Sequence, residues 1–300
     1  MMADLPGESG VVLLGGATGP RPPAPIDVSD MWTFAPEAGW RVITPALPEQ
    51  TGFAPLDGTM FAFDTQSGLA VFVDMNGLLL TYDPATNRWA DKPSGAGPTA
   101  LLGAAMAYDS GSDRMIVFGG LDPATFSENN ETWVYDVDAG RWERMEPAQS
   151  PSPRNFAALA YDADSDRVIL FGGAPSTGAL GDTWAYDYEG DTWTEMSPTA
   201  APSGRTYSAI AYDPTGDRMI LFGGSEDAEI SSLGDTWAYD YGSDVWTQLD
   251  VVGPSDRGWH AMALDADTGM LVLFGGGRSR DQYTAETWVF DLVANSWSRP

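Results

Sequence analysis

The chain has 300 residues, of which 43% are hydrophobic and 12% aromatic, a composition typical of a folded globular protein rather than a disordered one. Its 43 acidic and 15 basic residues give a formal net charge of −28, which disfavours nucleic acid and anionic lipid surfaces as partners. The chain has no cysteine and a single histidine, His260, which excludes disulfides, thiolate metal sites and a cysteine nucleophile.

The first ten residues have neither the basic nor the apolar segment of a signal peptide. No apolar run reaches the roughly 18 residues that a membrane helix needs, so we expect no membrane insertion. Strong acidity combined with a single lysine, Lys92, nevertheless leads us to expect an extracellular or cell-surface protein.

An internal repeat organises the chain. Phe-Gly-Gly occurs four times at spacings of 53, 51 and 52 residues, each time followed by Thr-Trp and, nine residues later, by a second tryptophan. The triplets begin at Phe118, Phe171, Phe222 and Phe274, and the tryptophan pairs are Trp133 and Trp142, Trp184 and Trp193, Trp237 and Trp246, and Trp288 and Trp297. Two weaker copies precede these four, so we predict a single domain of six units. The units span about 1–50, 51–98, 99–150, 151–202, 203–254 and 255–300.

Each unit contains four short runs bounded by Gly, Pro, Asp and Ser, which predicts four strands. In the fourth unit these runs are 156–162, 167–173, 183–187 and 192–196. First runs are rich in alanine, whereas the third and fourth runs carry the tryptophans. Small residues at one end of a sheet and large ones at the other suit sheets arranged radially, so we predict a β-propeller.

Four motifs resemble Kelch repeats of the galactose oxidase/Kelch-like superfamily. They are the Phe-Gly-Gly triplet, the Tyr-Asp pair, the tryptophan seven residues after that tyrosine, and Pro-Ser-x-Arg before the next first strand. The resemblance implies an all-β Kelch-type propeller with six four-stranded blades and the alanine-rich strand innermost.

The first unit is expected to be incomplete. Alignment on Leu14-Gly15-Gly16 leaves only residues 1–4 for its inner strand, and the chain stops just after the sixth outer strand. Either residues 1–5 form a short inner strand, or the sequence is a fragment of a longer chain. We favour a fragment or a divergently closed ring, because proteins normally cover an open sheet edge.

Enzymes that share this fold provide two tests. The copper radical oxidases need a Tyr–Cys crosslink and two histidine ligands, so the absence of cysteine and the single histidine exclude that activity. The plant specifier proteins use Glu-x3-Asp-x3-His to bind iron, but the matching positions here are Val252, Asp256 and His260, so the glutamate is missing. His260 lies in the common Kelch Arg-x-x-His, which favours a structural role.

An Arg-x-aromatic triplet precedes three consecutive first strands. The triplets supply Arg154 with Phe156, Arg205 with Tyr207, and Arg257 with Trp259, and the last loop adds Arg278 and Arg280. Residues two apart share one face of a strand, so we expect these side chains to meet at one mouth of the channel as an anion-selective ligand site. In Kelch-type adaptors of ubiquitin ligases, arginines at these positions bind acidic peptides.

A structural role for the three arginines is about equally well supported by the sequence. In that case they would pin the blade junctions by binding carbonyl groups and an aspartate of the next blade. Units two and three carry Leu56 and Leu101 at the arginine position, so the ring is asymmetric.

The opposite face should carry aspartate-rich hairpins. Asp162, Asp164 and Asp166 resemble the start of a calcium loop, but the glycine and the distal glutamate of that motif are missing. Ordinary turn chemistry is the favoured interpretation, so we expect no cofactor, with calcium at these aspartates as a minor alternative. The paired tryptophans should serve blade packing, which leaves Trp259 as the tryptophan best placed for a ligand.

We therefore predict a non-catalytic propeller that binds a protein or glycan partner, acidic if the arginines are free, through the Arg-x-aromatic face. One alternative is a carbohydrate isomerase or lyase that uses an arginine with Tyr207 or Glu226. A second alternative is a purely structural assembly module.

Overall fold

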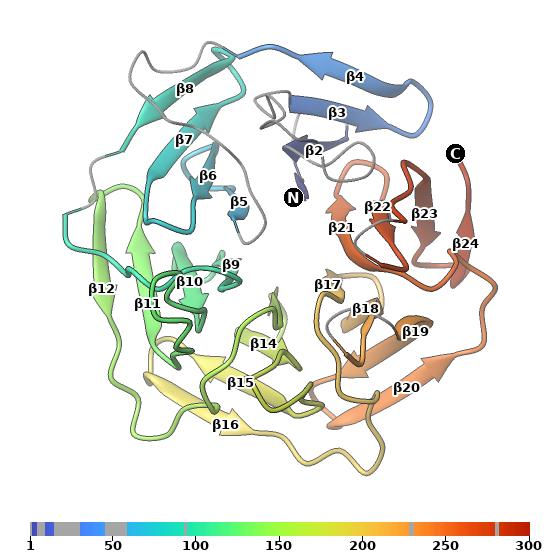
Figure 1. Ribbon diagram of the computed structural model, residues 1–300. Coiled ribbons are helices and arrows are strands. Elements are labelled where there is room, and N and C mark those ends of the chain that lie inside the picture. Colours follow the sequence, from blue (N-terminus) through green and yellow to red (C-terminus); the bar gives the residue numbers. More distant parts are fainter. Residues whose placement is uncertain are drawn as a thin grey trace.

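The computed structural model of the chain describes residues 2–4, 10–14, 31–45, 59–92, 95–227, 231–279 and 282–300. Within these ranges the chain forms 24 strands and no helix, so no described helix could cross a membrane. The strands form six four-stranded antiparallel sheets that stand around a central axis like the blades of a propeller (Figure 1). The predicted all-β fold with six four-stranded blades is therefore confirmed.

Each blade consists of four strands that follow one another in the sequence. Blades 1 and 2 contain β1 (Met2–Asp4), β2 (Val11–Leu14), β3 (Met31–Ala35), β4 (Gly39–Ile43), β5 (Met60–Asp64), β6 (Leu69–Val73), β7 (Leu79–Asp83) and β8 (Arg88–Asp91). Blades 3 and 4 contain β9 (Ala105–Asp109), β10 (Arg114–Phe118), β11 (Thr132–Asp136), β12 (Arg141–Arg144), β13 (Ala158–Asp162), β14 (Arg167–Phe171), β15 (Thr183–Asp187) and β16 (Thr192–Glu195). Blades 5 and 6 contain β17 (Ala209–Asp213), β18 (Arg218–Ser225), β19 (Ser232–Asp240), β20 (Val245–Leu249), β21 (Gly258–Asp265), β22 (Met270–Gly277), β23 (Thr287–Asp291) and β24 (Ser296–Ser298).

The first strand of each blade lies next to the axis, and the fourth lies at the rim (Figure 1). First strands of neighbouring blades contact one another around the ring, including β1 with both β5 and β21. Small side chains such as Ala105 and Ala107 in β9 and Ala158 in β13 are buried there, so the strands can pack closely where the blades converge. The alanine-rich strand is thus innermost, as predicted.

Neighbouring blades pack through apolar clusters that include the second tryptophan of each pair. Trp193, Trp246 and Trp297 are buried, and each indole Nε1 donates to a threonine hydroxyl on the third strand of the preceding blade. The acceptors are Thr132, Thr183 and Thr236, at 2.9, 2.9 and 3.0 Å. These tryptophans therefore serve blade packing, as the sequence predicts.

Blade 1 lies between blades 6 and 2 and closes the ring. Its inner strand is β1, which has three residues and pairs with β2. An apolar cluster joins Val11 of blade 1 to Val272 of blade 6, and Trp40 Nε1 donates to Thr287 Oγ1 at 2.6 Å. The structure thus contains the short inner strand considered for the first unit, and the fragment remains a prediction.

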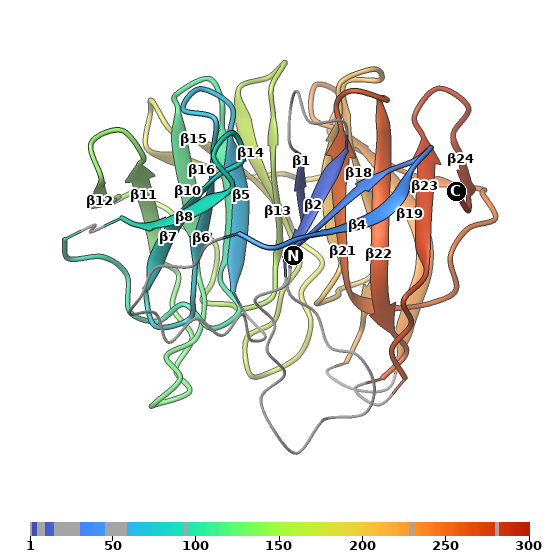
Figure 2. The same cartoon turned by 90° about the horizontal axis from the view of Figure 1, so that it is seen from above.

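The propeller has two unlike faces, seen from the side in Figure 2. Tight turns join first to second strands and third to fourth strands on the upper side of that view, which we call the turn face. Longer connections join second to third strands on the lower side, which we call the loop face. The residues that lead into the first strands lie there too, because Arg154 N donates to Asn129 O in the β10–β11 connection at 3.2 Å.

Candidate functional site

The three arginines predicted to line the mouth are buried inside the blades. Arg154, Arg205 and Arg257 are 1%, 0% and 1% exposed. Each lies shortly before the first strand of blade 4, 5 or 6, and its side chain bonds to both ends of the loop-face connection of its own blade. The prediction that these guanidinium groups face solvent and select anions is wrong, because they already have carboxylate and carbonyl partners within the protein.

Blade 5 shows this arrangement, which we call the arginine clamp, in full. Arg205 donates through Nε to Ser203 O at 3.0 Å and through Nη1 to Gly223 O at 2.9 Å. Its Nη1 and Nη2 atoms also bind the two carboxylate oxygens of Asp235, at 2.7 and 3.0 Å. This bidentate pairing uses the planar fork that distinguishes arginine from lysine. Arg154 binds Asp182 in the same way in blade 4, at 2.6 and 2.7 Å.

The partner carboxylate belongs to the arginine's own blade. The structural role considered at the sequence level therefore holds in outline, but an aspartate of the next blade is not the partner. It is the arginine backbone that reaches the neighbouring blade: Arg205 N donates to Leu180 O and Gly173 N donates to Arg205 O, at 2.9 and 2.8 Å. Each clamp residue thus joins two blades, one through its main chain and one through its side chain.

This junction explains the first glycine of Phe-Gly-Gly in blades 4 and 5. Gly172 has a φ of 70°, and a Cβ atom placed on it would lie 2.6 Å from Arg205 O. Gly223 has a φ of 62° and would place its Cβ 2.6 Å from Arg257 O. Any larger residue would push the next arginine out of the junction.

The clamps hold their carboxylates in the charged form. Burial alone would raise the pKa of Asp182 and Asp235, but hydrogen bonds and the positive charge of Arg154 and Arg205 outweigh it. The pKa of each carboxyl therefore lies below its ordinary value. Removing the carboxylate from such a pair is costly, because the guanidinium that remains is buried.

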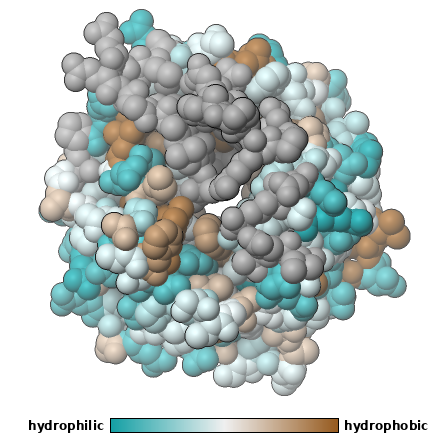
Figure 3. All heavy atoms as spheres, viewed as in Figure 1, coloured by the Kyte–Doolittle hydropathy of each residue, from teal (hydrophilic) through white to brown (hydrophobic). Residues whose placement is uncertain are grey.

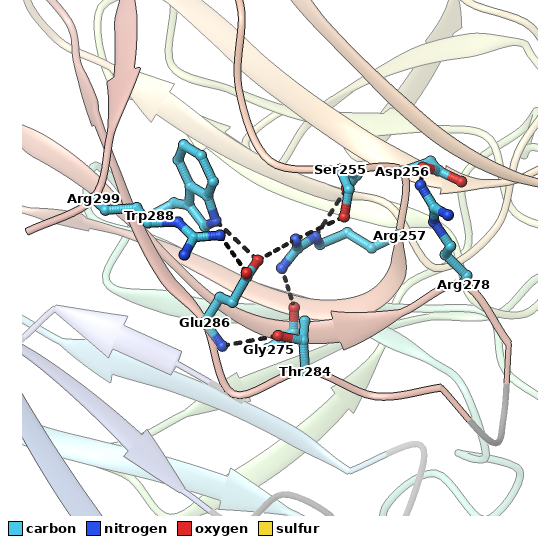
Figure 4. A network of polar contacts seen from close by, with 9 residues as sticks. All are labelled: Ser255, Asp256, Arg257, Gly275, Arg278, Thr284, Glu286, Trp288 and Arg299. Atoms are coloured by element: carbon cyan, nitrogen blue, oxygen red, sulfur yellow. Dashed lines mark hydrogen bonds and ion pairs between the residues drawn. The ribbon is translucent and has the colours of Figure 1, made fainter.

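Blade 6 uses a glutamate instead, and Figure 4 shows the resulting network. Arg257 Nη2 donates to Glu286 Oε2 at 2.8 Å, and Arg299 from the rim binds Glu286 Oε1. The Arg299 guanidinium also lies 4.8 Å from the ring centre of Trp288, in a cation–π contact. The hydrogen bond from Arg257 is the main cause of a lowered pKa at Glu286. Arg278 lies beside this network and pairs with the exposed Asp256, whereas Arg280 is outside the described residues.

The aromatic residues of the triplets form a column along the loop face. Phe156 and Tyr207 have ring centres 4.4 Å apart, and Tyr207 and Trp259 have ring centres 4.6 Å apart. Their backbones are linked in the same order, since Trp259 N donates to Tyr207 O at 3.2 Å and Tyr207 N to Phe156 O at 3.3 Å. All three side chains are half-buried. The structure therefore brings these three predicted residues together. The three arginines of the same triplets do not join them, because their guanidinium groups are buried.

A left-handed backbone separates the aromatic rings from the arginines. Phe156, Tyr207 and Trp259 have φ values of 53°, 55° and 58°, a region that bulky residues seldom adopt. The expectation that arginine and aromatic share a strand face is wrong, because the alternation of an extended strand does not apply to such residues. Gly103 takes the same place in blade 3 with a φ of 68°, and Phe156 N donates to its carbonyl oxygen at 2.6 Å. That glycine was the available sequence signal for this conformation.

His260 packs inside blade 6. Its ring meets Phe222 edge-on at 5.3 Å between ring centres, and neither buried ring nitrogen forms a well-shaped hydrogen bond with a described residue. Burial, assisted by the charge of Arg257, lowers the pKa of His260 to about 3. The histidine is therefore neutral at neutral pH, in agreement with the structural role expected from its motif. Val252, at the first position of the incomplete iron motif, is 94% exposed.

On the turn face, the aspartates hold tight turns. Asp162 Oδ1 accepts a hydrogen bond from Ser165 N at 3.1 Å, and Asp166 Oδ1 accepts one from Tyr161 at 2.8 Å. The described residues contain no group of three or more carboxylates or histidines that could hold a metal ion. Asp164 remains an exposed turn residue, and calcium binding here remains untested.

The sequence analysis did not single out two kinds of residue at this site. The clamp carboxylates Asp182, Asp235 and Glu286 each stand two residues before the first tryptophan of a pair, and that spacing was the available signal. Phe126 was also missed, although its side chain is 71% exposed on the loop face. Nothing in the repeat marks Phe126, because the loop that carries it varies from unit to unit.

A family model described as the KLHDC2/KLHL20/DRC7 Kelch-repeats domain matches residues 59–255. Three curated relatives show how widely similar sequences occur. The flagellar outer-arm dynein alpha chain of Chlamydomonas reinhardtii is 27% identical over 204 residues, covering 62% of this chain and 4% of that protein. Acyl-CoA-binding domain-containing protein 4 of Arabidopsis thaliana is 27% identical over 233 residues, covering 71% of this chain and 33% of that protein. Multiple epidermal growth factor-like domains protein 8 of Mus musculus is 25% identical over 259 residues, covering 81% of this chain and 9% of that protein. This chain thus matches a third or less of the length of each of these relatives.

Proposed function

Because the chain belongs to the Kelch-repeat family, whose propellers generally mediate protein interactions, we propose that its loop face binds a polypeptide segment on the rings of Phe156, Tyr207 and Trp259. The observation that carries the proposal is the column of three half-buried rings, each held by a left-handed backbone. Uncommon backbone conformations of this kind cluster at ligand-binding positions. Large aromatic side chains are also the residues that contribute most to binding at protein interfaces.

The clamps support this role without touching the partner. Each clamp fixes the residue two positions before the aromatic one. The ring is therefore presented by a backbone that is anchored on its own blade and on the preceding blade. Preorganised rings lose little conformational freedom when a partner packs against them. Figure 3, which views this face, shows apolar side chains exposed beside the central opening.

A selection from random dodecapeptides displayed on phage tests the proposal. We expect the intact chain to enrich peptides whose binding is lost in Trp259→Gly, a change that the φ of 58° tolerates. Val293→Ala is the matched control, because Val293 is a 78% exposed apolar residue after β23 on the turn face. Peptide binding that survives Trp259→Gly would contradict the proposal.

A glycan is the other partner considered for the same rings, since aromatic faces also pack against sugars. Binding to a glycan array without enrichment of any peptide would replace the polypeptide by a carbohydrate ligand. The isomerase or lyase alternative gains no support from the described contacts of Glu226, whose backbone N–H donates to Ser231 O in an exposed loop. It remains a prediction.

A further inference from the structure

Phe126 is the most exposed aromatic side chain among the described residues of the loop face. It lies in the connection between β10 and β11, is 71% exposed and has a φ of 56°. An exposed phenylalanine side chain buries little apolar surface and so adds little to the stability of the fold. A left-handed backbone would also suit glycine or asparagine better. The residue therefore calls for a role other than stabilising the fold.

The loop that carries Phe126 is held firmly from within. Asp122 Oδ1 accepts hydrogen bonds from Ala124 N and Thr125 N, at 2.7 and 3.1 Å. Phe126 N donates to Asp122 O at 2.8 Å, and Asp122 N donates to Ser127 O at 3.0 Å. The β10–β11 connection, which projects from the loop face in Figure 2, is thus ordered around Phe126 by its own hydrogen bonds.

This tip is linked to the ring column. Leu121, at the base of the loop, pairs with Leu102 by backbone hydrogen bonds, and Leu102 precedes Gly103. A Cβ atom on Gly103 would lie 2.6 Å from the Phe156 ring, so Phe156 covers Gly103 directly. Phe126 and the column of Phe156, Tyr207 and Trp259 therefore belong to one continuous stretch of the loop face.

The charges around this stretch are unbalanced. Asp122, Glu128 and Glu226 form no ion pair with a basic residue in the part of the chain that the structure describes. In contrast, each arginine that the structure describes on this face already forms an ion pair with a carboxylate of the chain. Arg154, Arg205 and Arg257 are buried in clamps, and Arg278 pairs with Asp256. The chain's single lysine, Lys92, follows β8 near the rim.

We propose that the loop face binds a basic polypeptide segment, which Phe126 on the β10–β11 connection anchors and which packs on the rings of Phe156, Tyr207 and Trp259. The inference rests on the proposed polypeptide-binding function and adds the charge of the partner. Arginine or lysine side chains satisfy both features, because they pack over aromatic rings and pair with carboxylates. The contact between Arg299 and Trp288 shows the same chemistry within this molecule.

The peptide selection on the intact chain tests the charge, and Phe126→Gly tests the anchor. We expect the enriched peptides to carry a net positive charge, and their affinity to fall on the order of tenfold between about 0.05 M and about 0.5 M salt. We expect Phe126→Gly to weaken binding on the order of tenfold without lowering the melting temperature, because glycine accepts a φ of 56°. Glu128→Gln should weaken binding less and should flatten the salt dependence.

Val293→Ala again serves as the control, and Phe126→Ala removes the ring while keeping a side chain at the left-handed position. Enrichment of acidic or uncharged peptides would overturn this inference but leave the proposed function intact. Basic peptides whose affinity is unchanged in both Phe126 variants would overturn the anchor and with it the inference. If every enriched peptide bound Trp259→Gly as well as the intact chain, the proposed function itself would be wrong.

Discussion

Blade 3 and blade 5 hold the same kind of loop in two different ways. In blade 5, the buried Arg205 clamps Asp235, and Tyr207 follows in the ring column. In blade 3, the matching positions are Leu101 and Gly103: Leu101 is buried in the apolar cluster between blades 2 and 3, and the loop carboxylate Glu131 pairs with Arg144 at the rim. Both blades have the same four strands and the same double glycine.

The comparison shows that the propeller does not need the clamp to form a blade. A buried ion pair is seldom more stabilising than an apolar core of similar volume, so stability alone does not explain why three consecutive blades keep it. What accompanies the clamp in blades 4, 5 and 6 is the aromatic residue two positions later. The clamp blades therefore form the sector of the loop face that presents rings, and blade 3 contributes the exposed Phe126 beside them.

Breaking the clamp from one side should have the largest effect. Asp235→Ala leaves the buried Arg205 guanidinium without its carboxylate, and we expect the free energy of unfolding to fall by about 3–5 kcal/mol. Gln248 lies opposite Trp237 in blade 5, as Arg144 lies opposite Trp133 in blade 3. Converting blade 5 to the arrangement of blade 3, through Arg205→Leu, Asp235→Glu and Gln248→Arg together, should restore most of that loss. Urea unfolding followed by tryptophan fluorescence measures both changes. A loss below about 1 kcal/mol in Asp235→Ala would mean that the clamp is not a structural element.

Blade 6 allows a sharper test, because it places His260 where blades 3, 4 and 5 have Ala104, Ala157 and Ser208. The folded pKa of His260 is about 3, whereas its ordinary value is 6.5, so between these values the unfolded chain binds a proton that the folded chain does not. The stability that depends on this residue is therefore present above pH 6.5 and is lost progressively as the pH falls below that value.

The variant His260→Ala gives blade 6 the residue of blade 4 and should remove this slope between pH 6.5 and 4, whatever its effect on stability at pH 7. Melting temperatures across that pH range measure it. An equal slope in the wild type and the variant would show that His260 is protonated in the folded chain.

Two glycines with similar backbones separate crowding from conformation. Gly223→Ala should cost about 1–3 kcal/mol, because its Cβ would lie 2.6 Å from Arg257 O in addition to the φ of 62°. Gly269 on the turn face has a φ of 67° and nothing within 4 Å of its Cβ position, so Gly269→Ala should cost about 1 kcal/mol. Equal losses in thermal unfolding would remove the blade junction as the reason for the first glycine of the pair.

The sequence was sufficient for the parts of the fold that repeat. The spacing of Phe118, Phe171 and Phe222 predicts the blades, and the tryptophan pairs predict their packing, because each of these residues has the same environment in every copy. The partners of the arginines could not be predicted in the same way. Arg205 meets Asp235 thirty residues later across a loop, and the left-handed backbone at Tyr207 breaks the alternation on which the expected arrangement depended.

The smallest expected change in stability belongs to Trp259→Gly, and this variant tests the division of roles between clamps and rings most directly. The variant loses the ring contact, worth about 0.5–1.5 kcal/mol, and the apolar area that the half-buried ring covers, and relief of the left-handed backbone offsets about 1–2 kcal/mol of that loss. We therefore predict a melting temperature that falls much less than in Asp235→Ala, together with loss of peptide binding. A melting temperature that falls as far as in Asp235→Ala, with peptide binding retained, would contradict the account, since the ring would then support the fold rather than contact a partner.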